Sequence, residues 1–179
     1  MMRILILLLS FLLINVSCVK DIDIKQIENS NFQIPVTIAL VKTDLTQHDF
    51  LDGNNNEVPK YAKLFLIDLD GIFHDDSMDS LELVTQFTNT FDREFVYYLE
   101  YLDSYNVRIM TSGREFVPAL CSQVIRSEVY EGERLESFAD ARRINVVVYL
   151  LDEGEILDEF NDRELEIQSV INYTIELDL

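Results

Sequence analysis

The chain is short of the residues that build disulfide frameworks and zinc sites. It contains two cysteines, Cys18 and Cys121, and two histidines, His48 and His74. Neither histidine lies near a cysteine pair, so the sequence holds no zinc-ligand spacing. A domain with so little scope for disulfides must rely on its hydrophobic core, and 179 residues are enough to build one.

Basic residues are also scarce. Lysine and arginine together number 14 against 33 acidic residues, which gives a formal net charge of −19. This surplus repels nucleic-acid phosphates and anionic membrane surfaces, so neither is an expected partner. Cations and basic protein surfaces suit such a chain better. A charged surface that keeps the protein dispersed is the simpler explanation.

Several motifs that would indicate an enzyme or ion site are absent. The sequence has no internal repeat, no low-complexity tract, no glycine-rich phosphate loop, no Gly-x-Ser-x-Gly elbow and no calcium-loop pattern. The apolar run Ile4–Ile14, interrupted by Ser10, is too short to cross a membrane, because a spanning helix needs about 20 apolar residues.

That apolar run belongs to a leader at the start of the chain. Arg3 gives a basic start, Ile4–Ile14 is apolar, and small residues precede Cys18. This order is the anatomy of a secretory signal peptide, so residues 1–17 are expected to be removed. The leader contains one base and no acid, so the mature chain would carry a net charge of −20.

The pair Ser17-Cys18 resembles the end of the lipobox of bacterial lipoproteins, which would span residues 14–18. The resemblance implies that the Cys18 sulfur receives diacylglycerol and that the mature protein begins there. Asn15 and Val16 depart from the family pattern, which prefers Leu and then Ala or Ser at these positions. The alternative is an ordinary signal peptide with an incidental cysteine.

Lipidation would have two consequences for the rest of the chain. It would leave Cys121 as a lone thiol, so no intramolecular disulfide would form. Residues 18–33, which are polar and mixed, would then form a tether between the membrane and a single acidic globular domain over 34–179.

Hydrophobic periodicity predicts strands that alternate with helices. The expected strands are Ile34–Val41, Leu64–Ile67, Val107–Met110, Ile144–Leu151 and an edge strand Asn172–Leu177, with helices over 84–105 and 116–125 and a loop over 49–60. This order predicts an α/β domain with a mostly parallel sheet flanked by helices. The alternative is a β-rich sandwich in which residues 95–102 form a strand.

Polar residues follow two of the expected strands. Asp68, Asp70 and Gly71 come after the strand at 64–67, and Thr111–Arg114 come after the next. In a parallel sheet these ends would share one edge, where ligands collect. One carboxylate could act as a nucleophile and the other as an acid–base group, while a hydroxyl and backbone amides could hold a phosphate.

Over residues 63–126 these segments resemble the first two motifs of the haloacid-dehalogenase-like phosphohydrolases. The resemblance implies that Asp68 is the nucleophile, that Asp70 is the general acid–base and that Thr111 is a phosphate ligand. Magnesium would be bound by Asp68 and Asp70. The family's lysine is missing, because no lysine follows Lys63, and its later acidic pair is not matched.

The sequence therefore predicts an exported, lipid-anchored envelope protein that acts as a non-catalytic interaction or anchoring subunit of an envelope or secretion complex. The expected partners are other envelope proteins and, through the lipid, the membrane; no nucleic acid and no cofactor are expected. Without lipid on Cys18 the protein would be secreted. The alternative function is a magnesium-dependent phosphohydrolase with Asp68, Asp70 and Thr111 at its site.

Overall fold

The computed structural model describes residues 31–67, 78–151, 154, 156–157, 160 and 162–178. Gln33–Glu176 form one compact unit, and its fold is the subject here. The expected signal peptide and the lipid site Cys18 lie outside the described residues, and so do Asp68 and Asp70.

The described residues form nine strands, one short α-helix and one 3-10 helix. In chain order they are β1 (Asn31–Thr46), η1 (Gln47–Phe50), β2 (Lys60–Leu66), β3 (Ser80–Asn89), β4 (Phe95–Leu102), β5 (Arg108–Thr111), β6 (Glu115–Val117), β7 (Val124–Glu131), α3 (Glu133–Ala139), β8 (Arg143–Leu150) and β9 (Glu164–Asp178).

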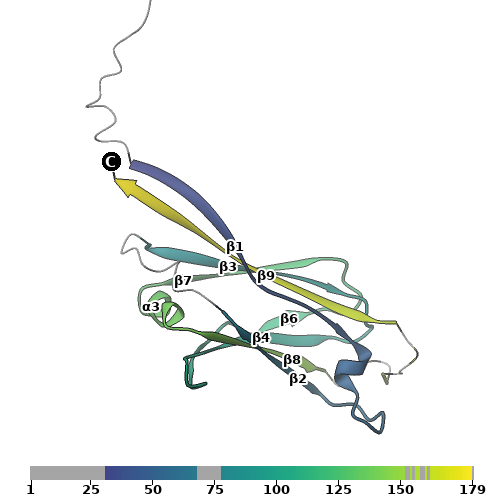
Figure 1. Cartoon of the computed structure of the whole chain (residues 1–179). Coiled ribbons are helices and arrows are strands. Elements are labelled where there is room, and N and C mark those ends of the chain that lie inside the picture. The colour runs from purple at the N-terminus through teal and green to yellow at the C-terminus, as the bar shows by residue number, and fades with distance from the viewer. Residues whose placement is uncertain are drawn as a thin grey trace, which may run out of the picture. The chain divides into compact units, whose positions relative to one another are not determined.

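The strands form two sheets. One has the order β1-β9-β3-β7, and the other has the order β2-β8-β4-β5, with β6 also paired to β4. The pairs β2–β8, β4–β8, β4–β5, β4–β6, β3–β7 and β3–β9 are all antiparallel. Figure 1 shows the sheets as two layers, with α3 at one end.

The expected α/β fold with a parallel sheet is wrong, and the β-rich sandwich, the alternative, describes the architecture. Residues from both sheets bury their side chains in one core. The rings of Phe87 on β3 and Tyr97 on β4 meet between the layers with centroids 5.0 Å apart. At one end, Phe138 of α3 packs against Tyr101 and Tyr130, one from each sheet.

The helix expected over 84–105 is instead strands β3 and β4. In β3 the buried residues alternate, as Leu81, Leu83, Thr85 and Phe87, which is the period of a strand. In β4 almost every residue is buried, so no alternation marks it as a strand. Buried aromatic and branched residues on both faces of β4 therefore produced three- and four-residue spacings that resembled a helix.

The helix expected over 116–125 is also wrong, because β6 ends at Val117 and β7 begins at Val124. The loop over 49–60 is confirmed after η1. The Asp52 carboxylate accepts hydrogen bonds from the backbone N–H groups of Asn54 and Asn56 there, at 2.8 and 2.9 Å.

The expected strands at 107–110 and 144–151 are confirmed within one residue at each end as β5 and β8, and the strand at 34–41 is confirmed as part of the longer β1. The strand at 64–67 is part of β2, but it is not buried as predicted: Leu66 is 80% exposed. The strand at 172–177 belongs to β9, which lies between β1 and β3 and is not at an edge.

Candidate functional site

Four side chains gather on the outer face of the five-stranded sheet, the face turned away from the core. They are Lys60 on β2, Tyr98 on β4, Tyr149 on β8 and Arg114 in the segment between β5 and β6. In the strand register, Lys60 is opposite Tyr149, and Tyr98 is opposite Val147, which precedes Tyr149 by two residues on β8. We call these four residues the aromatic-basic face.

The rings and cations of this face lie within contact range of one another. The Tyr98 and Tyr149 rings are nearly parallel, with an interplanar angle of 17° and centroids 6.2 Å apart. Lys60 Nζ lies 5.5 Å from the centre of the Tyr149 ring, and Arg114 Cζ lies 5.5 Å from that of Tyr98. Both distances suit cation–π attraction.

Neither Lys60 nor Arg114 forms an ion pair with a carboxylate among the described residues. Both side chains are exposed. Lys60 and Arg114 thus each lie beside an aromatic ring without a carboxylate partner in the described residues, as Lys63 does beside Phe65. Tyrosine and arginine side chains are enriched at binding surfaces.

The two phenol groups differ in their pKa. Burial and, after it, the hydrogen bond to Tyr149 raise the pKa of Tyr98 to about 12. The same hydrogen bond lowers the pKa of Tyr149, and Lys60 and Arg114 lower it as well. The surroundings of the Tyr149 oxygen therefore favour negative charge, and an anionic oxygen of a ligand placed there would be favoured for the same reason.

Two hollows adjoin the face and share Tyr98 and Arg114. The first has a volume of about 430 Å³ and lies against Pro59, Val96 and Tyr149. The second has a volume of about 370 Å³ and lies against Arg108, Thr111 and Ser112. Each is within the range of small-molecule sites, about 300–1,000 Å³.

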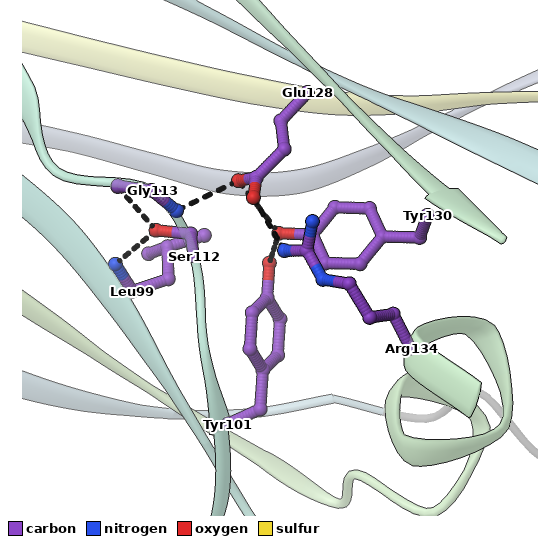
Figure 2. A network of polar contacts seen from close by, with 7 residues as sticks. All are labelled: Leu99, Tyr101, Ser112, Gly113, Glu128, Tyr130 and Arg134. Atoms are coloured by element: carbon purple, nitrogen blue, oxygen red, sulfur yellow. Dashed lines mark hydrogen bonds and ion pairs between the residues drawn. The ribbon is translucent and has the colours of Figure 1, made fainter.

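The backbone that leads to Arg114 is held by hydrogen bonds of Ser112 and Gly113, the two residues before it, which Figure 2 shows. The Leu99 N–H donates to Ser112 Oγ at 2.8 Å, and the Ser112 N–H donates to the Leu99 carbonyl at 2.9 Å. The Gly113 N–H donates to Glu128 Oε2 at 2.9 Å. These bonds fix the backbone from which the exposed Arg114 projects.

Glu128 is in turn held from the other side. Tyr130 OH donates to Glu128 Oε2 at 3.0 Å, Tyr101 OH lies 3.2 Å from Tyr130 OH, and Arg134 of α3 pairs with Glu128 Oε1. Figure 2 shows this network converging on the carboxylate. Burial raises the pKa of Tyr101 and Tyr130, so both stay protonated and can donate.

Arg93 holds the end of β8 beside the first hollow. The Arg93 side chain is 3% exposed, and its Nε donates to the Leu151 carbonyl at 2.9 Å. Its guanidinium also pairs with Glu57 at 3.2 Å. Leu151 follows β8 directly and lines the hollow, so Arg93 supports the wall behind Tyr149.

The sequence-predicted site residues are not seen together. Asp68 and Asp70 lie outside the described residues, while Thr111 is exposed at the end of β5. Ser112 and Gly113, expected to hold a phosphate, instead bind Leu99 and Glu128. Within the described residues, no three His, Cys, Asp or Glu side chains are grouped to hold a metal ion.

Sequence reasoning missed Lys60, Tyr98 and Tyr149. Part of the information was in the sequence. Tyr98 and Tyr149 stand at positions of β4 and β8 whose side chains alternate away from the core. Assigning β4 to a helix hid that pattern. In the parts of the chain that are described, no helix has the length and apolar character needed to cross a membrane.

Comparisons with known proteins bear on the fold. No protein-family model matches the sequence, and no curated protein is detectably similar to it. A candidate secreted protein from Parabacteroides distasonis is structurally similar, with a TM-score of 0.53 and 14% identity over 64% of this chain and 37% of that chain. This similarity supports the sandwich fold.

Two further solved structures are more distant. The bacteriophage CBA120 tailspike protein 4 aligns with a TM-score of 0.38 and 12% identity, over 80% of this chain and 19% of the other. The VP2 protein of infectious bursal disease virus aligns with a TM-score of 0.43 and 8% identity, over 80% and 32%. The chain thus covers well under half the length of each of these three structures.

Proposed function

We propose that this chain is an exported, lipid-anchored envelope protein whose β-sandwich acts by binding at the aromatic-basic face. The observation that carries the proposal is the pair of exposed cations, Lys60 and Arg114, beside the parallel rings of Tyr98 and Tyr149. The outer face of an antiparallel sheet is normally solvated and polar. Here Lys60 and Arg114 lie beside Tyr98 and Tyr149, next to Glu100, which is paired with Arg108 and Asn145.

The leader and the likeness to a secreted protein support export. Residues 1–17 have the order of a signal peptide, and Cys18 follows a small residue as in the lipobox. The structurally similar Parabacteroides distasonis protein is described as a candidate secreted protein. A diacyl anchor on Cys18 would hold the domain stably at a membrane, since each buried methylene contributes about 0.8 kcal/mol.

The role of subunit in an envelope or secretion complex stays a prediction, and so does the expected protein partner. The phosphohydrolase alternative is not proposed, because it requires a parallel α/β sheet and the described strands pair antiparallel. In this sheet Thr111 ends a strand that pairs with β4 in the opposite direction.

Anchoring is tested by substituting Cys18 and fractionating the cells. The wild type is expected in the membrane fraction, with a diacylglyceryl mass on the first mature residue. Cys18→Ala is expected to remain unprocessed or to leave the membrane fraction. Cys121→Ala is the matched control and should behave as the wild type, because Cys121 is a half-buried free thiol within the described domain. An unmodified mature start at Val19 or later would contradict anchoring.

A further inference from the structure

We infer that the aromatic-basic face binds an acidic polysaccharide, a glycan whose sugar rings carry carboxylate groups. The inference deepens the proposed function, because export would bring the domain to the glycans outside the cell. It depends on three features of the face: its rings, its paired hollows and its uncompensated charge.

The rings provide a surface for sugars. Sugar rings present axial C–H groups that pack on aromatic faces, while their hydroxyls bond at the edges. Tyr98 and Tyr149 are nearly parallel, at 17°, and their hydroxyl groups are hydrogen-bonded to each other. Tyr149 is half-buried and offers the accessible ring, while the buried Tyr98 supports it from β4. Tyr149 thus combines apolar area with a polar atom, which is the mixture that a sugar requires.

The two hollows suggest a chain-like ligand. They lie on either side of Tyr98 and Arg114 and measure about 430 and 370 Å³. Adjacent hollows that share a ring and a cation suit neighbouring units of a polymer. A folded protein partner would instead favour a continuous flat contact of the usual interface size.

Charge selects the acidic kind of glycan. Lys60 and Arg114 have no carboxylate partner among the described residues, and an arginine can bind a carboxylate through two parallel hydrogen bonds. The net charge of −19 does not prevent this, because charges beyond about 8 Å are largely screened at physiological salt. A densely sulfated polymer would bring more negative charge than two cations balance, so one carboxylate per sugar fits better.

The aromatic-basic face is also preorganised for binding. Ser112 and Gly113 fix the backbone at Arg114, so ordering this segment costs little on binding. The ring positions are fixed in the same way, because Tyr98 is 9% exposed and lies in a central strand.

The experiment measures binding of polygalacturonate to the protein isolated from cells, in detergent where it carries lipid, by titration calorimetry. Wild type should bind polygalacturonate, bind its fully methyl-esterified form at least 10-fold more weakly, and lose affinity as salt rises. Lys60→Gln and Arg114→Gln should each weaken binding about 10-fold, as expected for loss of a charge-assisted hydrogen bond. Lys42→Gln is the matched control. Lys42 is 65% exposed and pairs with Glu166 on the other sheet, so affinity should not change.

Several outcomes would overturn the inference. These are no binding of polygalacturonate by wild type, equal binding of the methyl ester, or unchanged binding in both Lys60→Gln and Arg114→Gln. Tighter binding of poly-glutamate would show that the face takes an acidic protein segment, and tighter binding of dextran sulfate would show a sulfate site. Thermal unfolding confirms that the variants are folded. None of these results alters the fractionation of Cys18→Ala, so the two proposals fail separately.

Discussion

The two sheets of this protein bury equivalent inner faces but present very different outer faces. The outer face of the four-stranded sheet carries amides, hydroxyls and carboxylates that bond to one another, beside the exposed apolar residues Ile125 and Val129. Its pairs are Gln86–Gln123, Ser127–Glu82, Asn172–Glu82, Gln168–Glu166 and Lys42–Glu166. We call this set the polar face. On the five-stranded sheet, by contrast, Lys60 and Arg114 lie against aromatic rings.

The comparison teaches where binding capacity remains. On the polar face the Lys42 charge is matched by Glu166, although a hollow of about 630 Å³ lies against Glu82, Val129 and Asn172. On the aromatic-basic face, Lys60 and Arg114 lie against rings and form no ion pair among the described residues. Net charge and composition average over both faces and conceal this difference.

Reversing the two charges of the aromatic-basic face should have the largest effect on binding. Lys60→Glu combined with Arg114→Glu would turn the aromatic-basic face acidic and should weaken polygalacturonate binding about 100-fold or more. Both side chains are exposed, so the free energy of unfolding should change by less than about 0.5 kcal/mol per substitution. Titration calorimetry and urea unfolding measure the two effects. Lys42→Glu, on the polar face, should leave binding unchanged, and an equal loss there would contradict the distinction.

A pH series separates inner tyrosines from the outer Tyr149. Burial raises the pKa values of Tyr97, Tyr101 and Tyr130 above 10.0, the ordinary value. The unfolded chain loses these protons near pH 10 while the folded chain keeps them, so the free energy of unfolding falls as pH rises above 10. The decline is expected to approach about 1.4 kcal/mol per pH unit for each tyrosine.

Urea unfolding between pH 8 and 11 measures this decline. Tyr101→Phe should make it shallower. Tyr149→Phe should remove a small gain in stability just below pH 10, because the pKa of Tyr149 is lowered and the folded chain ionises there first, and should leave the decline above pH 10 unchanged. If the free energy of unfolding falls less steeply with pH in Tyr149→Phe than in Tyr101→Phe, the pKa values of the buried tyrosines and of Tyr149 do not differ as described.

Removing the carboxylate behind Arg114 tests how the aromatic-basic face is held. Glu128→Ala leaves the Gly113 N–H and the Tyr130 hydroxyl without their acceptor and should cost about 1–3 kcal/mol. It should also weaken polygalacturonate binding several-fold, since Arg114 loses its fixed backbone. Glu131→Ala, an exposed carboxylate on the same strand, is the matched control and should change stability by less than about 0.5 kcal/mol. If Glu128→Ala loses stability but binds polygalacturonate with full affinity, Glu128 does not position Arg114.

The smallest effect is expected on the polar face. Glu82→Gln keeps an acceptor for Ser127 and Asn172, so the free energy of unfolding should stay within about 0.5 kcal/mol. Polygalacturonate binding should be the same as in wild type. A clear loss of binding in this variant would mean that the ligand lies on the wrong sheet.

The sequence allowed part of this fold to be predicted. Ile144–Leu151 was recognised as a strand because it is a continuous run of branched residues, and it is β8. β4 was assigned to a helix in the preferred interpretation, and only the alternative sandwich gave residues 95–102 as a strand. Its inner residue Tyr97 fills the core while its outer residue Tyr98 joins the aromatic-basic face. With both faces apolar, the two-residue period that identifies a strand disappears.

The candidate site was harder to predict than the fold. Thr111–Arg114 was singled out as polar, yet its role depends on Glu128 and Leu99, which the chain brings to it from other strands. Lys60 and Tyr149 come together only through the pairing of β2 with β8. The pairing register of strands far apart in the sequence cannot be derived from local residue spacing. The aromatic-basic face depends on that register, because its residues come from different strands.

The most direct test of the account is to map the ligand onto the two sheets by nuclear magnetic resonance. Uniformly ¹⁵N-labelled protein is titrated with short galacturonate oligomers, and the backbone amide shifts are followed. We expect the largest shifts at Lys60, Tyr98, Arg114 and Tyr149, with little change at Glu82, Gln86 and Gln168 of the polar face. Shifts concentrated on the polar face, or absent from both sheets at saturating oligomer, would contradict the claim that the five-stranded sheet carries the binding site.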